Sequence, residues 1–339
     1  MDRERIQKIL DQRKEPAFRA KQIMAAVYGQ RISSWEQATS LSKELRDALA
    51  DVPTSTLELS HRAQSKKDGT VKALFKLADE KEIEAVMIPN GDFRTVCVSS
   101  QVGCAMKCSF CATGTMGLKR NLSADEIVDQ VLFFEKELAP KNERVTNVVF
   151  MGMGEPCANL DNVFEAIRIM NSKDGLGIGA RKISISTCGI VPGIRRIADF
   201  DLQINLAVSL HAPTDDVRSE IMPVNKAYSI GQVLDACRDY LRKTNRKLFF
   251  EYVMLSGIND SIEQADELGA VLKDFRPLIQ VNLIPFHQSF FEFRPTARAA
   301  IERFQSIVLA AGIPCTIRHS AGVDIAAACG QLALERKEK

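Results

Sequence analysis

The 339-residue sequence has no apolar run that approaches the roughly 20 residues needed to span a membrane. Its first residues, MDRERIQKIL, are too polar for a secretory signal, so we expect a cytoplasmic protein with no membrane partner. Internal repeats and low-complexity tracts are also missing. With 45% hydrophobic and 26% charged residues, the composition is that of an ordinary globular protein.

A large excess of one charge is likewise missing, because the net charge is only +2. The charge is unevenly spread, however, and Lys and Arg outnumber Asp and Glu over residues 1–76. A polyanionic partner would therefore meet the N-terminal part first, although a solvated basic surface with no partner explains the same pattern.

Nine cysteines without an export signal indicate metal or catalytic chemistry, not a disulfide framework. Three of them, Cys104, Cys108 and Cys111, form a CxxxCxxC motif, called here the cysteine loop (residues 104–111). Structural zinc and ordinary electron-transfer clusters normally take four ligands, so three thiolates suit a [4Fe-4S] cluster with one iron open to a small molecule. The spacing resembles the radical S-adenosylmethionine (SAM) superfamily, whose members bind SAM through that iron; zinc is the alternative.

Sequence periodicity divides the chain into four parts. Residues 1–53 predict a helical module, in which residues 33–51 form a helix with a serine at its start. Residues 54–89, the β-extension, predict short strands between charged turns. Residues 90–324 alternate six apolar strands with six helices, and residues 325–339 form a C-terminal segment. The alternation predicts an α/β fold with a parallel sheet covered by helices, arranged as a partial (βα)6 barrel.

The expected barrel elements follow from β-branched apolar runs and from helical spacing. The strands are residues 95–100, 145–151, 182–187, 204–210, 248–254 and 279–284, and the helices are residues 123–138, 160–171, 191–199, 229–241, 261–274 and 296–312.

Residues with chemical roles are expected at the C-terminal ends of the barrel strands. The run GMGEP follows the second strand, and it resembles the motif that holds the amino group of SAM in radical SAM enzymes, with Gly154 and Glu155 in the matching positions. Further polar residues at strand ends are Ser186, Ser209, His211 and Asn282. Each has an ordinary capping or turn explanation by itself, so they indicate a ligand site only as a set.

Several motifs together resemble the RlmN/Cfr family of radical SAM RNA methyltransferases over nearly the whole chain. They are VCVSSQVGCxxxCxFC, GMGEP, SLHAP, NLIP and the terminal DIAAACGQL. The cysteine of ACGQL, Cys329, is not a generic radical SAM feature, which makes the resemblance specific. It implies a [4Fe-4S] cluster on the three loop cysteines, SAM on the fourth iron and two SAM molecules per turnover. The implied SAM contacts are Gly154, Glu155, Ser186, Ser209, Leu210, His211 and Asn282.

The resemblance also implies a staged reaction. Cys329 takes a methyl group from one SAM, a radical from a second SAM removes hydrogen from that methyl, and the carbon radical adds to an adenine. Cys97 then assists proton removal and attacks the Cys329 sulfur, so that methylated RNA leaves as a disulfide forms. Glu84 occupies the place of a family glutamate assigned as proton acceptor. An exposed carboxylate at a strand edge, with Cys97 as base, is the other interpretation.

The implied substrates are an adenosine of 23S rRNA at the peptidyl transferase centre and the adenosine beside the anticodon of certain tRNAs, methylated at C2. Basic residues of the N-terminal module would contact phosphates, and the target base must be flipped out of its stack. A flavodoxin or ferredoxin type electron donor is implied, and we expect a monomer. Trp35 and Tyr28 either stack on RNA or belong to the core of the module.

Three alternatives remain open. Within the family, Cfr-type enzymes methylate C8 of the same rRNA adenosine and confer antibiotic resistance; Pro285 and Phe286 favour the C2 type, whereas ATG after Cys111 resembles the C8 type. Outside it, the candidates are a radical SAM enzyme acting on a protein or small molecule, and a non-catalytic RNA-binding protein with a structural metal. The remaining cysteines, expected to be buried apolar residues, are Cys157, Cys188, Cys237 and Cys315.

Overall fold

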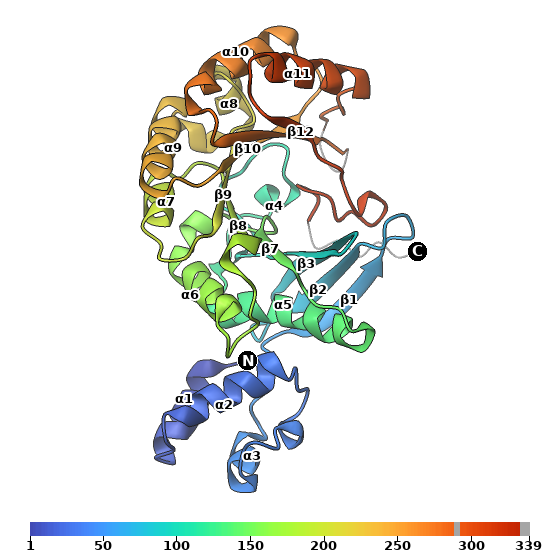
Figure 1. Cartoon of the computed structure of the whole chain (residues 1–339). Coiled ribbons are helices and arrows are strands. Elements are labelled where there is room, and N and C mark those ends of the chain that lie inside the picture. Colours follow the sequence, from blue (N-terminus) through green and yellow to red (C-terminus); the bar gives the residue numbers. More distant parts are fainter. Residues whose placement is uncertain (288–291, 333–339) are drawn as a thin grey trace.

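The computed structural model describes residues 1–287 and 292–332. A ten-stranded sheet with the order β1-β2-β3-β4-β7-β8-β9-β10-β11-β12 forms the centre of the molecule (Figure 1). In that order the strands are β1 (Glu58–Gln64), β2 (Val71–Lys76), β3 (Glu82–Asn90), β4 (Phe93–Cys97), β7 (Asn147–Phe150), β8 (Ile183–Thr187), β9 (Asn205–Ser209), β10 (Leu248–Met254), β11 (Ile279–Pro285) and β12 (Cys315–Ile317). A separate pair is formed by β5 (Gln101–Val102) and β6 (Arg120–Asn121).

All neighbouring strands from β4 to β12 pair in parallel, which confirms the predicted parallel sheet. Each of the six predicted strands is present. The seventh parallel strand, β12, was missed because three residues are too short for a periodic pattern. It adds to the edge of β11 through the pair Asn282↔Thr316.

Helices cover the outer face of the parallel strands, and α6, α7 and α9 follow one side of the sheet in Figure 1. The helices of this part are α4 (Ala112–Thr115), α5 (Ala124–Leu138), α6 (Leu160–Asn171), α7 (Val191–Ala198), α8 (Asp215–Ile221), α9 (Ile230–Thr244), α10 (Ile262–Leu272) and α11 (Arg298–Ala310). Capping boxes begin α5, α9 and α10 at the serines that the sequence indicated, Ser123, Ser229 and Ser261. The six predicted helices are confirmed; α4 and α8 were not predicted.

The N-terminal module lies below the barrel in Figure 1 and contains α1 (Arg3–Gln12), α2 (Phe18–Met24) and α3 (Lys43–Leu49). Tyr28 and Trp35 are 1% and 5% exposed and belong to its apolar core, which favours the structural interpretation of both aromatic residues.

The single helix predicted for residues 33–51 is wrong. A short 3-10 turn, η2 (Trp35–Gln37), is followed by a break, and α3 begins only after Ser42. The reason is local capping, because the Ser42 hydroxyl accepts a hydrogen bond from the backbone N–H of Leu45. The other short helical segments are η1 (Ala25–Gly29), η3 (Ala139–Lys141), η4 (Pro156–Ala158), η5 (Ala180–Lys182), η6 (Pro223–Lys226), η7 (Lys273–Phe275) and η8 (Val323–Ile325).

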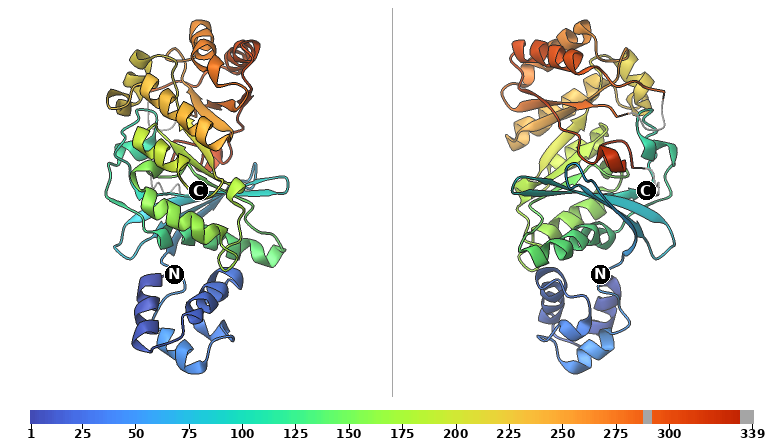
Figure 2. Two further views of the ribbon diagram at one scale, coloured as in Figure 1. Left: turned by 60° about the vertical axis from the view of Figure 1, so that its left-hand side comes forward. Right: turned by 90° about the vertical axis from the view of Figure 1, so that its right-hand side faces the viewer.

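The β-extension continues the barrel sheet. Its strands β1, β2 and β3 pair antiparallel, and β3 pairs with β4 through Val86↔Cys97. Residues 318–332, the tail segment, return from β12 and run between the barrel and the β-extension (Figure 2). The last residues of the predicted C-terminal segment, 333–339, lie outside the described residues.

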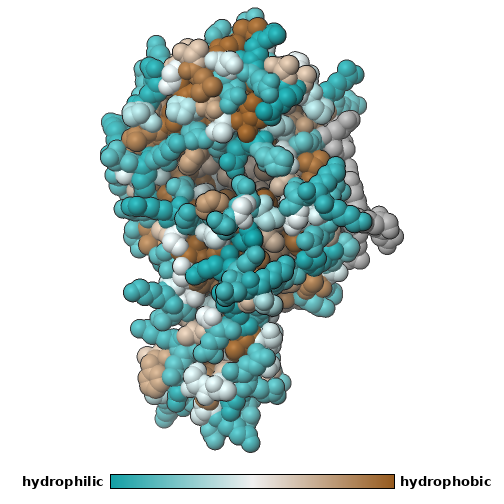
Figure 3. Space-filling model, turned by 45° about the vertical axis from the view of Figure 1, so that its right-hand side comes forward, coloured by the Kyte–Doolittle hydropathy of each residue, from teal (hydrophilic) through white to brown (hydrophobic). Residues whose placement is uncertain are grey.

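The face in Figure 3 is mostly hydrophilic, with apolar side chains in small scattered groups. Over the described ranges, none of the helices combines the length and the apolar character that crossing a membrane requires.

Candidate functional site

The cysteine loop follows β4 and reaches into the mouth of the barrel. Gly103, just before it, has φ of +74°, and a Cβ there would lie 1.9 Å from the carbonyl oxygen of Gly117, so only glycine fits. The loop is held from within by Cys111 N–H donating to the Cys108 carbonyl at 3.1 Å. Ser109 N–H also donates to the carbonyl of Ile221 at 3.0 Å, which ties the loop to α8.

The three thiols of the loop line one cavity of about 170 Å³, called here the cluster cavity. Burial raises the pKa of Cys104 to about 11 and raises that of Cys108 further, with the Cys111 and Cys104 thiols adding to the shift of Cys108. Such thiols release protons when they bind metal. Three convergent thiols beside an open cavity fit a cluster with three protein ligands. Among the described residues, no group of three or more His, Cys, Asp or Glu side chains is already arranged to hold a metal ion, so the assignment of the three thiols rests on their spacing and on their shared cavity.

The loop after β7 places Glu155 in the wall of the cluster cavity. Its carboxylate is 4% exposed and accepts hydrogen bonds from the backbone N–H of Cys157 at 2.9 Å and of Cys188 at 2.8 Å. Gly154 has φ of +102°, and a Cβ there would lie 2.6 Å from Cβ of Gln101. Glycine thus lets the chain pass close enough for Gln101 to accept a hydrogen bond from Glu155 N–H at 2.9 Å.

The other strand-end residues predicted to contact a ligand line two adjoining cavities, with Asn282 in the second, which is described below. Ser186, Ser209 and His211 line the cluster cavity. Burial lowers the pKa of His211 to about 3, and its Nδ1 accepts a hydrogen bond from Val253 N–H at 3.0 Å, so the neutral ring keeps Nε2–H as a donor. In contrast, the side chain of Leu210 is fully buried in the apolar core.

A second cavity, of about 280 Å³, adjoins the first and is called here the tail cavity. It is lined by Cys97 at the end of β4, by Asn282 on β11 and by Cys329 of the tail segment, and it shares Cys111 and Cys329 with the cluster cavity. Burial, and then the nearby Cys329 thiol, raise the pKa of Cys97. Cys97 and Cys329 are both free thiols.

Cys329 is the exposed cysteine of the pair, and its exposed surface faces the two cavities it lines. The protein atoms that surround these cavities desolvate its thiol and, with the charge of Glu251, raise its pKa, while Arg318 opposes them. The structure therefore brings the tail sulfur to the cysteine loop across one shared space.

Glu251 is a site residue that the sequence reasoning missed. It lies on β10, is 7% exposed and lines both cavities. Its Oε1 accepts a hydrogen bond from Asn282 Nδ2 at 2.9 Å, and burial raises its pKa. A charged residue within the apolar run LFFEYVM was the signal that could have found it, because such a residue is rarely buried without a role.

The other four cysteines are buried as predicted, and Cys157 and Cys188 lie next to the Glu155 carboxylate. Glu84, in contrast, is not the exposed carboxylate at a strand edge that one interpretation required. It is 0% exposed and forms an ion pair with Lys72, with 2.9 Å between Oε1 and Nζ.

Arg218 on α8 was also missed, and it connects the ends of two strands that line the cluster cavity. Its guanidinium is fully buried and donates hydrogen bonds to the carbonyl oxygens of Cys188 at 2.7 Å, Ser209 at 3.2 Å and Leu210 at 3.1 Å. The arginine thus fixes the backbone after β8 and β9, from which Ser209 and His211 enter the cavity.

Replacing Arg218 with methionine is expected to lower the free energy of unfolding by about 3 kcal/mol, because buried carbonyl groups lose their donors. Urea unfolding of the metal-free chain, followed by circular dichroism, measures this as a lower midpoint. The matched control is Arg242→Met, at an exposed surface ion pair, which should leave the midpoint in place. Equal midpoints for both variants would contradict the role given to Arg218.

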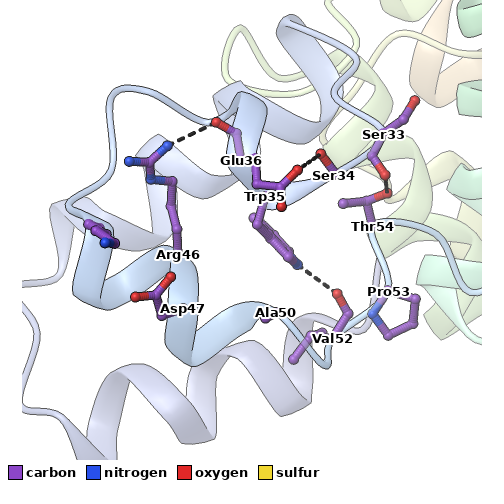
Figure 4. A pocket seen from close by; sticks show the side chains of 11 residues that line it. Ser33, Ser34, Trp35, Glu36, Arg46, Asp47, Ala50, Val52, Pro53 and Thr54 are labelled. Atoms are coloured by element: carbon purple, nitrogen blue, oxygen red, sulfur yellow. Dashed lines mark hydrogen bonds between the residues drawn. The ribbon is translucent and has the colours of Figure 1, made fainter.

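A cavity of about 480 Å³ in the N-terminal module lies between η2 and α3 (Figure 4). The indole N–H of Trp35 points away from solvent and donates to the carbonyl of Val52 at 2.6 Å, and Arg46 donates to the carbonyl of Glu36 at 2.9 Å. Acidic Glu36 and Asp47 line it beside basic Lys43 and Arg46, so its charge does not by itself make a phosphate site. Contact between this module and RNA stays a prediction.

Comparison with known proteins gives matches to the barrel and to the N-terminal module. A family model described as the radical SAM superfamily matches residues 98–269, and one described as the ribosomal RNA large subunit methyltransferase N-terminal domain matches residues 1–54. The chain is 44% identical over 320 residues to a probable dual-specificity RNA methyltransferase RlmN of Thermoanaerobacter sp. (strain X514), covering 94% of this chain and 92% of that protein.

A relative with the same description from Staphylococcus aureus (strain Newman) is 45% identical over 322 residues, covering 95% of this chain and 88% of its own length. The crystal structure of a radical SAM methyltransferase from Sphaerobacter thermophilus superimposes with a TM-score of 0.93 at 43% identity. That match covers 99% of this chain and 98% of the other.

Proposed function

Because this chain belongs to the RlmN family of radical SAM RNA methyltransferases, we propose that it methylates C2 of an adenosine in 23S rRNA and of the adenosine beside the anticodon in certain tRNAs. The observation that carries the proposal is the position of Cys97 and Cys329 in one cavity, adjoining the three cysteines of the cysteine loop. A methyl carrier and a resolving thiol need this proximity, and a simple SAM-dependent transferase does not.

The chain is an enzyme whose family uses a [4Fe-4S] cluster and SAM, and when bound these supply the radical that activates a methyl group. We propose Cys104, Cys108 and Cys111 as the cluster ligands. Glu155 would hold the amino group of SAM, since its carboxylate is fixed in the cavity wall by two backbone donors. The other proposed contacts that line the two cavities are Gly154, Ser186, Ser209, His211 and Asn282.

In the proposed reaction Cys329 carries the methyl group and becomes joined through it to the adenine ring. Cys97 then attacks the Cys329 sulfur, so that an S–S bond forms as the bond between sulfur and the transferred carbon breaks. The burial of Cys97 keeps its thiol protonated until it is needed, and its place at the end of β4 fixes it beside the tail sulfur. Glu84 is a candidate proton acceptor, and its carboxylate is paired with Lys72.

The membership in this family decides against a non-catalytic RNA-binding protein with a structural metal. Methylation at C8 is the second candidate within the family, and the relatives described as RlmN at 44% to 45% identity favour C2. We further propose a monomer that works in the cytoplasm with a flavodoxin or ferredoxin type electron donor.

Nucleoside analysis of treated RNA tests the position of methylation. Transcripts of the 23S peptidyl transferase region and of tRNA are incubated with reconstituted enzyme, SAM and a reductant, then digested for mass spectrometry. We expect 2-methyladenosine from both RNAs and none when the reductant is left out. The appearance of 8-methyladenosine alone would overturn the C2 assignment while leaving RNA methylation intact.

A further inference from the structure

Lys72 is a buried lysine of the β-extension that contacts the tail segment. It is 5% exposed on β2, and its Nζ lies 2.9 Å from Oε1 of Glu84 on β3. Nζ also donates a hydrogen bond to the carbonyl oxygen of Ala326 at 3.2 Å. Lysine is almost never fully buried unless its charge is paired, and here Glu84 supplies the opposite charge.

The strand register explains why Lys72 and Glu84 meet. Lys72 is opposite Val86, and Leu74 is opposite Glu84, so Lys72 and Glu84 are diagonal neighbours on one face of the antiparallel pair. Glu84 is fully buried on β3. Its charge therefore orients the ammonium, and the ammonium in turn reaches the tail segment.

A second hydrogen bond connects the β-extension to the tail segment, four residues before Ala326. The carboxylate of Asp68, in the turn between β1 and β2, accepts a hydrogen bond from the Gly322 N–H at 2.9 Å. Gly322 has φ of +66°, and a Cβ there would lie 2.8 Å from Cγ2 of Thr70, so the two segments approach as closely as glycine allows. Figure 2 shows η8 of the tail segment beside these strands.

Contacts on the other side of Cys329 come from α4, which directly follows the cysteine loop. The Ala112 N–H donates to the Gly330 carbonyl at 2.8 Å, and the Thr113 hydroxyl donates to the Leu332 carbonyl at 2.8 Å. Cys329 therefore lies between an anchor on the β-extension, at Ala326, and an anchor on α4, at Gly330. Two residues separate it from the first anchor.

We propose that Lys72 is a positioning residue that sets Cys329 in the tail cavity by holding the Ala326 carbonyl against the β-extension. The inference rests on the proposed function only for the role of Cys329 as methyl carrier. Without the Nζ contact, the segment before Cys329 keeps the hydrogen bond at Gly322 but loses its connection to the buried ion pair. The carrier sulfur then samples positions away from Cys97.

Hydrogen exchange of the metal-free chain, read by mass spectrometry, tests the anchor itself. The variant is Lys72→Met with Glu84→Gln, which removes the Ala326 contact without leaving a buried carboxylate unpaired. Peptides covering residues 323–331 should exchange roughly tenfold faster, the effect of losing a hydrogen bond to a charged donor, while β7 and β8 keep their protection. The matched control is Lys76→Met with Glu80→Gln, an exposed ion pair that begins on the same strand, which should change nothing in the tail.

Unchanged exchange of residues 323–331 in a folded double variant would overturn the proposal. If that variant does not fold, Lys72→Gln with Glu84→Gln replaces it, because the glutamine side chain at position 72 is one bond shorter than lysine, which leaves the Ala326 carbonyl out of reach, and no buried carboxylate is left unpaired. For either variant, faster exchange of residues 323–331 supports the proposal and unchanged exchange contradicts it.

The ratio of 5′-deoxyadenosine formed to adenine methylated tests whether the Lys72 contact affects the reaction. With Lys72→Gln we expect more 5′-deoxyadenosine for each adenine methylated, because SAM is cleaved while the carrier is misplaced, and Lys72→Arg should bring the ratio back toward that of the unchanged chain. A merely structural role would lower both products together. If the unchanged chain methylates no RNA, the proposed function fails, whereas the exchange result for residues 323–331 still decides the anchor.

Discussion

A chain with alanine in place of Cys329 is expected to methylate no RNA, a loss of at least about a thousandfold in rate. Cys329 is the exposed thiol that faces both the cysteine loop and Cys97, so no neighbouring group replaces it as carrier. Intact mass after incubation with SAM and reductant should show a gain of about 14 Da on the unchanged chain, mapped to Cys329, and no gain on the variant.

The matched control is Cys237→Ala, because Cys237 is equally a free thiol but is buried on α9. It should keep both the mass gain and the methylated RNA. Normal turnover by the Cys329 variant would contradict the carrier role. It would favour the alternative of a radical SAM enzyme in which this cysteine is incidental.

The fold could be predicted well because its signals are local. Each barrel helix has its own apolar face, and serines such as Ser123 and Ser261 mark where helices begin. The predicted helix was wrong in a polar run that is compatible with either one long helix or two shorter helical segments. Residues 33–51 have helical spacing throughout, but Ser42 caps a later start and breaks the expected helix.

The site could be predicted where a motif or a strand end marked it. The three loop cysteines, Glu155 and His211 all reach the cluster cavity. Residues that act through contacts between distant parts of the chain have no sequence pattern that marks them. Arg218 stands in DDVRSEI, which is typical of a solvent-exposed helix, yet its guanidinium is fully buried against the ends of β8 and β9.

Lys72 shows the same limit on a strand. Its neighbours in the sequence, TVKALFK, suggest an ordinary alternating strand with lysines in solvent, and Lys76 behaves so. Lys72 is buried because a segment some 250 residues later in the chain covers it, as the hydrogen bond between its Nζ and Ala326 shows. No sequence pattern within the β-extension indicates that the tail segment buries Lys72, so only the tertiary structure identifies the contact.

Replacing Cys97 with alanine should stop the reaction one step later than the Cys329 variant and trap the enzyme on its RNA. Cys97 is the thiol of the tail cavity that belongs neither to the cysteine loop nor to the tail segment, and the bond between the Cys329 sulfur and the transferred carbon breaks only when a nucleophile attacks that sulfur. Alanine leaves the methyl carrier intact but supplies no attacking thiol. We therefore expect a slow-migrating protein–RNA species on a denaturing gel, formed only with SAM and reductant and lost after ribonuclease treatment.

Two companion variants make this result specific to the pair. The Cys97→Ala, Cys329→Ala double variant should form no such species, because the carrier sulfur is gone, and Cys237→Ala should release methylated RNA as the unchanged chain does. A crosslinked species from the double variant would mean that another residue joins the RNA. Its absence from the Cys97 single variant would show that some group other than Cys97 releases the product, even though Cys97 and Cys329 line the same cavity.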